Sequence, residues 1–230
     1  MNAPGPVQQP LTSAWSMYRA IVGVGALCAL LIVTVYQTTA GRIRENQERF
    51  LALAVSQVLP AAQSTVAVVL ADDGHLEKVD KAPALPVFLG YDADDELVGA
   101  VVTAQGMGYQ DNIRVLYAYS FELNAIVGFK VLDSKETPGL GDKIEKEPHF
   151  IANFEKLEAA LTAAGDALLH PIVTVKQGKK EEPWQIDGIT GATITSEAIG
   201  KILNDSANTW APILEREARI FASGETTEEP

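Results

Sequence analysis

The most constraining feature of this sequence is a long uncharged stretch near its beginning. Residues 20–41, AIVGVGALCALLIVTVYQTTAG, contain no charged side chain, and their centre is almost wholly apolar. As a helix that rises about 1.5 Å per residue, such a run crosses a hydrocarbon core of about 30 Å. Aromatic and basic residues flank the run on both sides, as is typical of the two membrane interfaces: Trp15, Tyr18, Arg19, Tyr36, Arg42 and Arg44. We therefore predict a single membrane-spanning helix over residues 19–40, with the lipid bilayer as its partner.

A cleaved signal peptide is the alternative interpretation of this stretch. Thr38, Thr39 and Ala40 offer a cleavage site of small residues, but the apolar run is longer than that of an ordinary signal peptide. The charges around the span bear on its orientation. Arg19 is the only charge before it, whereas three arginines follow within residues 42–49, so the positive-inside rule taken alone leaves the following domain in the cytoplasm.

Composition narrows the classes of function. The chain carries 18 Lys and Arg against 30 Asp and Glu, a net charge of −12. Because nucleic-acid binding needs a basic surface, we expect no nucleic-acid partner. The single cysteine, Cys28, rules out an internal disulfide, and with only three histidines the sequence offers no pattern of metal ligands. We expect no metal site, and no catalytic residues from the chain itself.

The part after the span has the pattern of one α+β domain. Short polar breaks separate four β-rich runs, PVFLGYD, LVGAVVTAQG, NIRVLYAYS and AIVGFKVLD, which favours a mainly antiparallel sheet. The sequence then predicts a helix over FIANFEKLEAALTAAG, a strand over PIVTVK and a final helix from about Thr195 to Phe221. The predicted organisation is a disordered segment 1–18, the transmembrane helix 19–40, a connecting helix 41–60, a domain 61–222 and a frayed tail 223–230.

The stretch DGITGATITSEAIG, from Asp187 to Gly200, places small residues and hydroxyls just before a predicted helix. Gly191 and Ala192 leave room for a bulky group to approach the backbone, and the start of a helix attracts anions such as phosphate. The simpler interpretation is a tight turn followed by a helix that Thr195 or Ser196 caps. Capping alone does not account for the number of hydroxyls or for the acid at the start.

The first seven residues of this stretch, DGITGAT, resemble the flavinylation motif of FMN-binding domains. In that family a flavin transferase joins the phosphate of FMN to the hydroxyl of the last threonine through a phosphoester. The resemblance implies that Thr193 is the attachment site, with Thr195 as its local rival. It also implies that the other motif residues contact the cofactor, namely Asp187, Thr190, Gly191 and Ala192.

A second motif, SKETPGLGDKI at residues 134–144, directly follows a predicted strand. Pro138 and the glycines around Leu140 indicate a turn, and a purely structural loop is the alternative. The segment resembles one found in the G subunit of the Rnf electron-transport complex and in the C subunit of the sodium-pumping NADH:quinone oxidoreductase. In those subunits the segment helps to line the flavin site, so the resemblance implies that Glu136, Thr137 and Leu140 lie next to the flavin. Ser134 stands where this family often has histidine, so no histidine role is transferred.

The resemblance extends over nearly the whole chain, and the chain length fits the Rnf G subunit better. It implies a fold in which a single N-terminal transmembrane helix precedes an FMN-binding domain. It also implies a membrane oxidoreductase subunit that carries electrons on covalent FMN, in an ion-translocating complex linking ferredoxin and NAD. The implied partners are the other membrane and peripheral subunits of the complex and the flavin transferase. The implied location is the inner membrane with the domain in the periplasm, which we prefer to the arginine count.

Three alternatives remain at the level of sequence. The chain is also similar to the C-type subunit of the sodium pump. A cofactor-free membrane scaffold predicts a colourless protein that tolerates loss of the Thr193 hydroxyl. A module that binds a phosphorylated ligand reversibly predicts a cofactor that is lost on denaturation.

Overall fold

The computed structural model describes residues 14–223, apart from residue 73, residues 80–82 and residue 84. The chain divides into two compact units, residues 1–50 and residues 51–230. Most of the predicted disordered segment and nearly all of the predicted tail lie outside the described residues. Residues 14–18 and Ser223, however, are helical, because the first and last helices extend further than their sequence patterns indicate.

The first unit holds most of helix α1 (Ala14–Val58), which joins the predicted transmembrane and connecting helices in one 45-residue element. It is the one helix of the described residues that is long and apolar enough to cross a membrane. Its polar hydroxyls bond within the helix: Thr34 donates to the carbonyl of Leu30 at 2.7 Å, and Thr38 to that of Thr34 at 2.9 Å. Such internal pairing lets a helix carry threonines through hydrocarbon.

The last two turns of α1 belong to the second unit. Ala54, Val55 and Val58 are buried there, together with Leu59, against the sheet residues Val101, Leu116 and Ala118. Gly128 makes this close approach possible, because a Cβ atom at that position would overlap the carbonyl group of Val58. The end of α1 is therefore part of the hydrophobic core of the domain.

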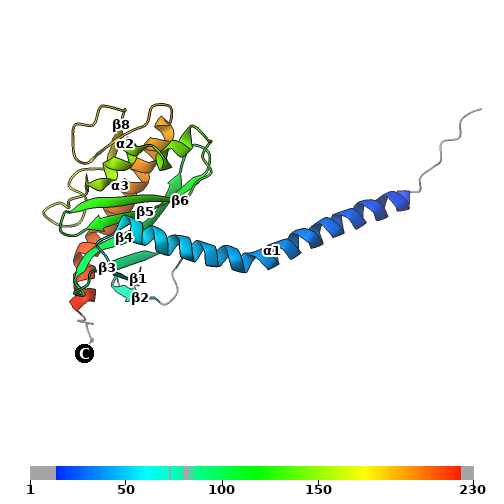
Figure 1. Ribbon diagram of the computed structural model, residues 1–230, viewed down its shortest axis with the longest axis horizontal. Coiled ribbons are helices and arrows are strands. Elements are labelled where there is room, and N and C mark those ends of the chain that lie inside the picture. The colour runs from blue at the N-terminus through cyan, green and yellow to red at the C-terminus, as the bar shows by residue number, and fades with distance from the viewer. Residues whose placement is uncertain (1–13, 73, 80–82, 84, 224–230) are drawn as a thin grey trace, which may run out of the picture. The chain divides into compact units, whose positions relative to one another are not determined.

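A seven-stranded antiparallel sheet forms the centre of the domain, in the order β2-β1-β3-β4-β5-β6-β7 (Figure 1). The four predicted strands are β3 (Val87–Tyr91), β4 (Leu97–Met107), β5 (Asn112–Ser120) and β6 (Ala125–Asp133). The sheet also contains β1 (Ser64–Leu70), β2 (Leu76–Lys78) and β7 (Leu157–Glu158). Together with the helices, this sheet confirms the predicted α+β class.

The helix predicted over residues 150–165 is wrong. The structure has only a helical turn α2 (Pro148–Ile151) and a 3-10 turn η2 (Ala152–Glu155) before the chain enters β7. The apolar residues of this segment contact different neighbours. Phe154 stacks on Phe129 with ring centroids 4.2 Å apart, while Leu157 pairs with Ile126 at the sheet edge. The apolar spacing that resembled one helical face is thus divided between a short turn and a strand.

Helix α3 (Thr193–Ser223) covers the face of the sheet opposite the end of α1, with Ile199, Leu203 and Leu214 buried in the main core. A separate pair of parallel strands, β8 (Val173–Val175) and β9 (Gln185–Asp187), lies beside α3. The 3-10 helix η1 (Gly141–Glu145) contacts both α3 and β6. These short elements bring the two sequence motifs together at the beginning of α3.

Candidate functional site

The first motif forms a tight turn between β9 and α3. The N–H of Ala192 donates to the carbonyl of Ile189 at 3.0 Å, and the side chain of Ile189 anchors the turn in the core. Gly191 adopts a φ of 84°, which explains the preference for glycine at this position. The N–H of Thr190 donates to Oε1 of Gln177 at 3.0 Å. The turn is therefore held at both ends and leads directly into the helix.

The four hydroxyls of the motif have different surroundings. Thr195 and Ser196 are buried, and both hydroxyls are engaged: Thr195 Oγ1 donates to Oε2 of Glu136 at 2.8 Å, and Ser196 Oγ donates to the carbonyl of Ala192 at 2.9 Å. Thr190 and Thr193 are exposed. Thr193 is the first residue of α3, so its side chain stands at the helix N-terminus. Only these two exposed threonines are available to a modifying enzyme.

Glu136 ties the second motif to the first. The residue is 6% exposed, and its carboxylate accepts hydrogen bonds from the Thr195 hydroxyl and, at 2.9 Å, from the N–H of Gln110. A Cβ atom at Gly108 or at Gly141 would collide with this carboxylate. In the described part of the chain no basic side chain pairs with it. The two hydrogen bonds therefore place Glu136 inside the structure, where it positions the loops rather than offering a free carboxylate.

Four apolar side chains are exposed on the segments that meet at Glu136. They are 52–66% exposed and come from the end of β4, the β4–β5 turn, the ETPGLG loop and the start of α3: Met107, Tyr109, Leu140 and Ile194. We call these four residues the apolar rim. Exposed apolar groups that gather around polar residues are typical of ligand or partner sites. The predicted flavin neighbour Leu140 lies in this rim.

The other residues predicted from the second motif have local partners. Thr137 is half-buried, and its hydroxyl donates to Oε1 of Gln110 at 3.0 Å. The N–H of Leu140 donates to the carbonyl of Thr137 at 3.1 Å, which closes the turn, and Gly139 has a φ of 78°. Gln110 thus bonds to both Glu136 and Thr137, so the β4–β5 turn and the ETPGLG loop form one unit.

Asp187, the acid of the first motif, ends β9 and is half-buried. Its Oδ1 accepts the N–H of Gly178 at 2.6 Å, and Asn153 bonds to both its backbone N–H and its carbonyl. Lys180 donates to Oδ1 of Asn153 at 3.2 Å. Burial lowers the pKa of Lys180, and the nearby Asp187 charge partly offsets this. Asp187 therefore closes the β8–β9 loop behind the turn.

Sequence reasoning missed Lys143, which lies in η1. Its Nζ is 3.8 Å from the point where a Cβ atom of Gly191 would stand, so a cation lies beside the turn before Thr193. Its place in the ETPGLGDKI segment was visible in the sequence, but the proximity to Gly191 depends on the fold of that loop.

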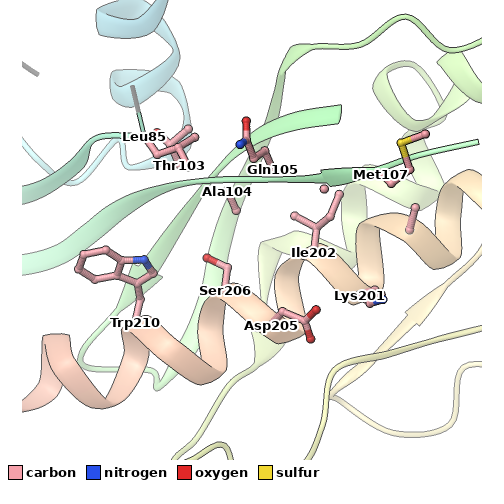
Figure 2. Close-up of a pocket in the computed structure, with 12 residues that line it drawn as sticks. Leu85, Thr103, Ala104, Gln105, Met107, Lys201, Ile202, Asp205, Ser206 and Trp210 are labelled. Atoms are coloured by element: carbon pink, nitrogen blue, oxygen red, sulfur yellow. The ribbon is translucent and has the colours of Figure 1, made fainter. Parts of the chain in front are cut away.

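A cavity of about 370 Å³ lies between β4 and α3 and shares Met107 with the apolar rim. Figure 2 shows Trp210 toward one end of it and Lys201 toward the other, with Ile202 and Ser206 between them on α3. This volume is in the range of small-molecule sites. Met107 of the apolar rim therefore borders an indentation rather than a flat surface.

Comparison with known proteins identifies the family. The sequence profile of the FMN-binding domain matches residues 108–208, a segment that contains both motifs. The G subunit of the Na(+)-translocating ferredoxin:NAD(+) oxidoreductase complex of Acetobacterium woodii is 30% identical over 197 residues, which cover 83% of this chain and 87% of that protein. The chain belongs to the family of G subunits of ion-translocating oxidoreductase complexes. A second G subunit, from Methanosarcina acetivorans, is 29% identical over 191 residues, which cover 82% of this chain and 89% of the relative.

Solved structures confirm the fold of this G-family chain. NqrC of Shewanella oneidensis superposes with a TM-score of 0.53 at 17% identity, over 80% of this chain and 98% of that one. The C subunit of the Na(+)-translocating NADH-quinone reductase of Parabacteroides distasonis superposes with a TM-score of 0.56 at 22% identity, over 76% and 98%. The family assignment confirms the predicted resemblance and makes the chain a membrane-anchored flavoprotein subunit of an oxidoreductase.

The residues at the start of α3 fit FMN, a long molecule with a phosphate at one end and a planar ring at the other. For the N–H groups of Thr193, Ile194 and Thr195, no acceptor is found among the described residues, so the positive end of the helix has three donors without a protein partner. Such a terminus suits a phosphate, and the apolar rim suits a ring. The site thus offers a place for each end of the cofactor.

Proposed function

We propose that this chain carries FMN bound covalently through its phosphate to the hydroxyl of Thr193. The observation that carries the proposal is the contrast between the two threonines at the start of α3. Thr193 is exposed at the helix N-terminus, whereas the rival Thr195 is buried and donates its hydroxyl to Glu136. A transferase that acts on the folded chain reaches Thr193 without breaking a buried hydrogen bond.

The bound cofactor supplies the electron transfer, and the chain supplies its position and surroundings. Glu136 fixes the start of α3 relative to the β4–β5 turn, and the turn Ile189–Ala192 fixes the approach to Thr193. The apolar rim excludes water from one side of a ring placed over it. In this proposal Asp187, Thr190, Gly191 and Ala192 shape the attachment site, while Thr137 and Leu140 shape the loop next to the ring.

We propose further that the chain works within an Rnf-type complex that couples electron transfer between ferredoxin and NAD to ion movement. The name of the relative from Acetobacterium woodii supports this assignment. The partners are then the other membrane and peripheral subunits, with a separate flavin transferase for maturation. The domain lies in the periplasm and α1 crosses the inner membrane once. A covalent tether suits that compartment, because a dissociated cofactor there is lost to the cell.

Intact mass after denaturation tests the covalent link. The chain is produced with and without the flavin transferase, unfolded in denaturant, freed of small molecules and weighed. The expected result is a mass higher by one FMN less one water, only with the transferase. Loss of all colour on unfolding, with an unmodified mass, contradicts the proposal and favours a reversible binding module. A colourless and unmodified folded protein favours the cofactor-free scaffold.

The orientation has its own test. An exposed position in the β8–β9 loop, Lys179→Cys, is introduced into a chain whose own cysteine is removed by Cys28→Ser. A membrane-impermeant thiol reagent applied to intact spheroplasts labels this site if the domain is periplasmic. Labelling only after lysis places the domain in the cytoplasm, as the arginine count alone indicates.

A further inference from the structure

Among the residues that the structure describes, Lys143 differs from its basic neighbours in having no partner of opposite charge. Lys135 pairs with Asp111 at 2.9 Å, and Lys146 pairs with Asp142. For the half-buried Lys143, no carboxylate or hydrogen-bond acceptor lies within bonding distance among the residues that the structure describes. Holding a lysine side chain partly out of water costs conformational entropy and hydration, so an unpaired one at a fixed place calls for a counter-charge.

The surrounding loop explains why Lys143 stays unpaired. Asp142, its sequence neighbour, is engaged elsewhere: it accepts a hydrogen bond from Lys146 and another from the N–H of Gly139 at 2.6 Å. The bond from Lys146 is the main reason why the pKa of Asp142 lies below its ordinary value. Ile144 is fully buried and anchors η1 in the core. The carboxylate nearest in sequence is thus directed away, and the lysine is left beside Gly191.

We propose that Lys143 binds the phosphate of the flavin nucleotide and positions it for transfer to Thr193. Its Nζ lies 3.8 Å from the Cβ position of Gly191, two residues before the acceptor. An ammonium group there neutralises charge on the non-bridging phosphate oxygens, both as the bond forms and in the finished diester. Lys143 is a positioning residue, since the reacting atoms belong to Thr193 and to the nucleotide. This inference rests on the proposed covalent attachment.

The transfer step balances without any change of oxidation state. The Thr193 oxygen forms a bond to phosphorus of a flavin dinucleotide, and the bond from that phosphorus to the bridging oxygen breaks. A nucleoside monophosphate leaves, and the hydroxyl proton passes to the released group or to solvent. The product diester keeps one negative charge beside Lys143.

The rate of this transfer gives the first test. Purified unmodified chain is mixed with transferase and flavin dinucleotide, and the fraction of modified chain is followed by intact mass. Because hydrogen bonds to charged groups are strong, we expect Lys143→Gln to slow modification about tenfold or more. Lys143→Arg keeps most of the rate, and the control Lys156→Gln, at an exposed position at the end of η2, leaves it unchanged.

A second readout separates phosphate binding from contact with the transferase. Chains modified to completion are compared by phosphorus NMR, and Lys143→Gln is expected to move the diester resonance while Lys156→Gln is not. A wild-type rate in Lys143→Gln overturns the inference. So does equal slowing by Lys143→Arg, or slowing with an unmoved resonance. A wild-type chain that is never modified overturns the proposed function itself, and the inference with it.

Discussion

Replacing Thr195 with valine separates the two threonines at the start of α3. The substitution keeps the shape of the side chain but removes the hydroxyl that donates to Oε2 of Glu136. The glutamate is 6% exposed and its carboxylate keeps only the hydrogen bond from Gln110, so one buried oxygen loses its partner. Leaving a buried acceptor unpaired costs about 1–3 kcal/mol, more for charged groups. For a domain of this size each kcal/mol lowers the melting temperature by about 2–4 °C, so we expect a fall of about 2–12 °C.

The assay is thermal unfolding of the purified chain, followed by near-ultraviolet circular dichroism. Thr195→Ser is the control, because it keeps the donor and loses a single methyl group, worth about 0.8 kcal/mol. We expect Thr195→Val to accept FMN and to melt early, and Thr193→Val to do the reverse. The reasoning is refuted if Thr195→Val melts with the wild type, or if it remains folded and unmodified.

Two further predictions concern the stability of the domain. A truncated chain that begins at residue 61 lacks the buried end of α1, and losing Val55, Val58 and Leu59 removes about 5–9 kcal/mol of apolar burial, which is comparable to the whole stability of a domain. We expect this truncated chain to be insoluble where a chain that begins at residue 44 folds, and equal denaturant midpoints for the two chains contradict this. Burial alone raises the pKa of Glu217, but hydrogen bonds from Arg216 and His75 outweigh burial and lower this pKa. The ionised Glu217 therefore stabilises the fold above its unfolded pKa of 4.5, and this stabilisation is lost as the pH falls through the lower pKa of the folded state. Denaturant unfolding between about pH 6 and about pH 3, which spans the carboxyl range, should therefore show a smaller loss of stability for Glu217→Gln than for wild type, and parallel losses contradict the assignment.

The sequence predicted the parts of the fold that have a strong local pattern. Each of β3 to β6 is a β-rich run bounded by polar turns, and α3 has an apolar face along its whole length, so local signals and tertiary contacts agree there. The helix prediction after Phe150 is wrong because the apolar residues of this segment pack against two different partners, Phe129 and the edge of β6. Strand β1 was missed for another reason. It begins shortly after the end of α1, and its pairing with β3 joins distant residues such as Ser64 and Tyr91, which no local pattern specifies.

In the candidate site, too, the sequence predicted what depends on a local motif and missed what depends on tertiary contacts. Motif spacing was enough to select Thr193 and the ETPGLG loop, because both belong to a resemblance over contiguous residues. The hydrogen bond between Glu136 and Thr195 joins residues that are 59 positions apart, and no local pattern predicts it. The proximity of Lys143 to Gly191 is likewise a product of tertiary structure. The structure thus supplied what sequence could not: which hydroxyls are already engaged.

The most direct measurement is the site of modification within the motif. Chain produced with the transferase is digested, and the peptide that holds Thr190, Thr193 and Thr195 is fragmented in a mass spectrometer, beside the same peptide from Thr193→Val and Thr190→Val. The account predicts one FMN phosphoester, placed on Thr193 by the fragments, absent in Thr193→Val and retained in Thr190→Val. A phosphoester on Thr190 or Thr195, or a modified peptide in Thr193→Val, contradicts the central claim.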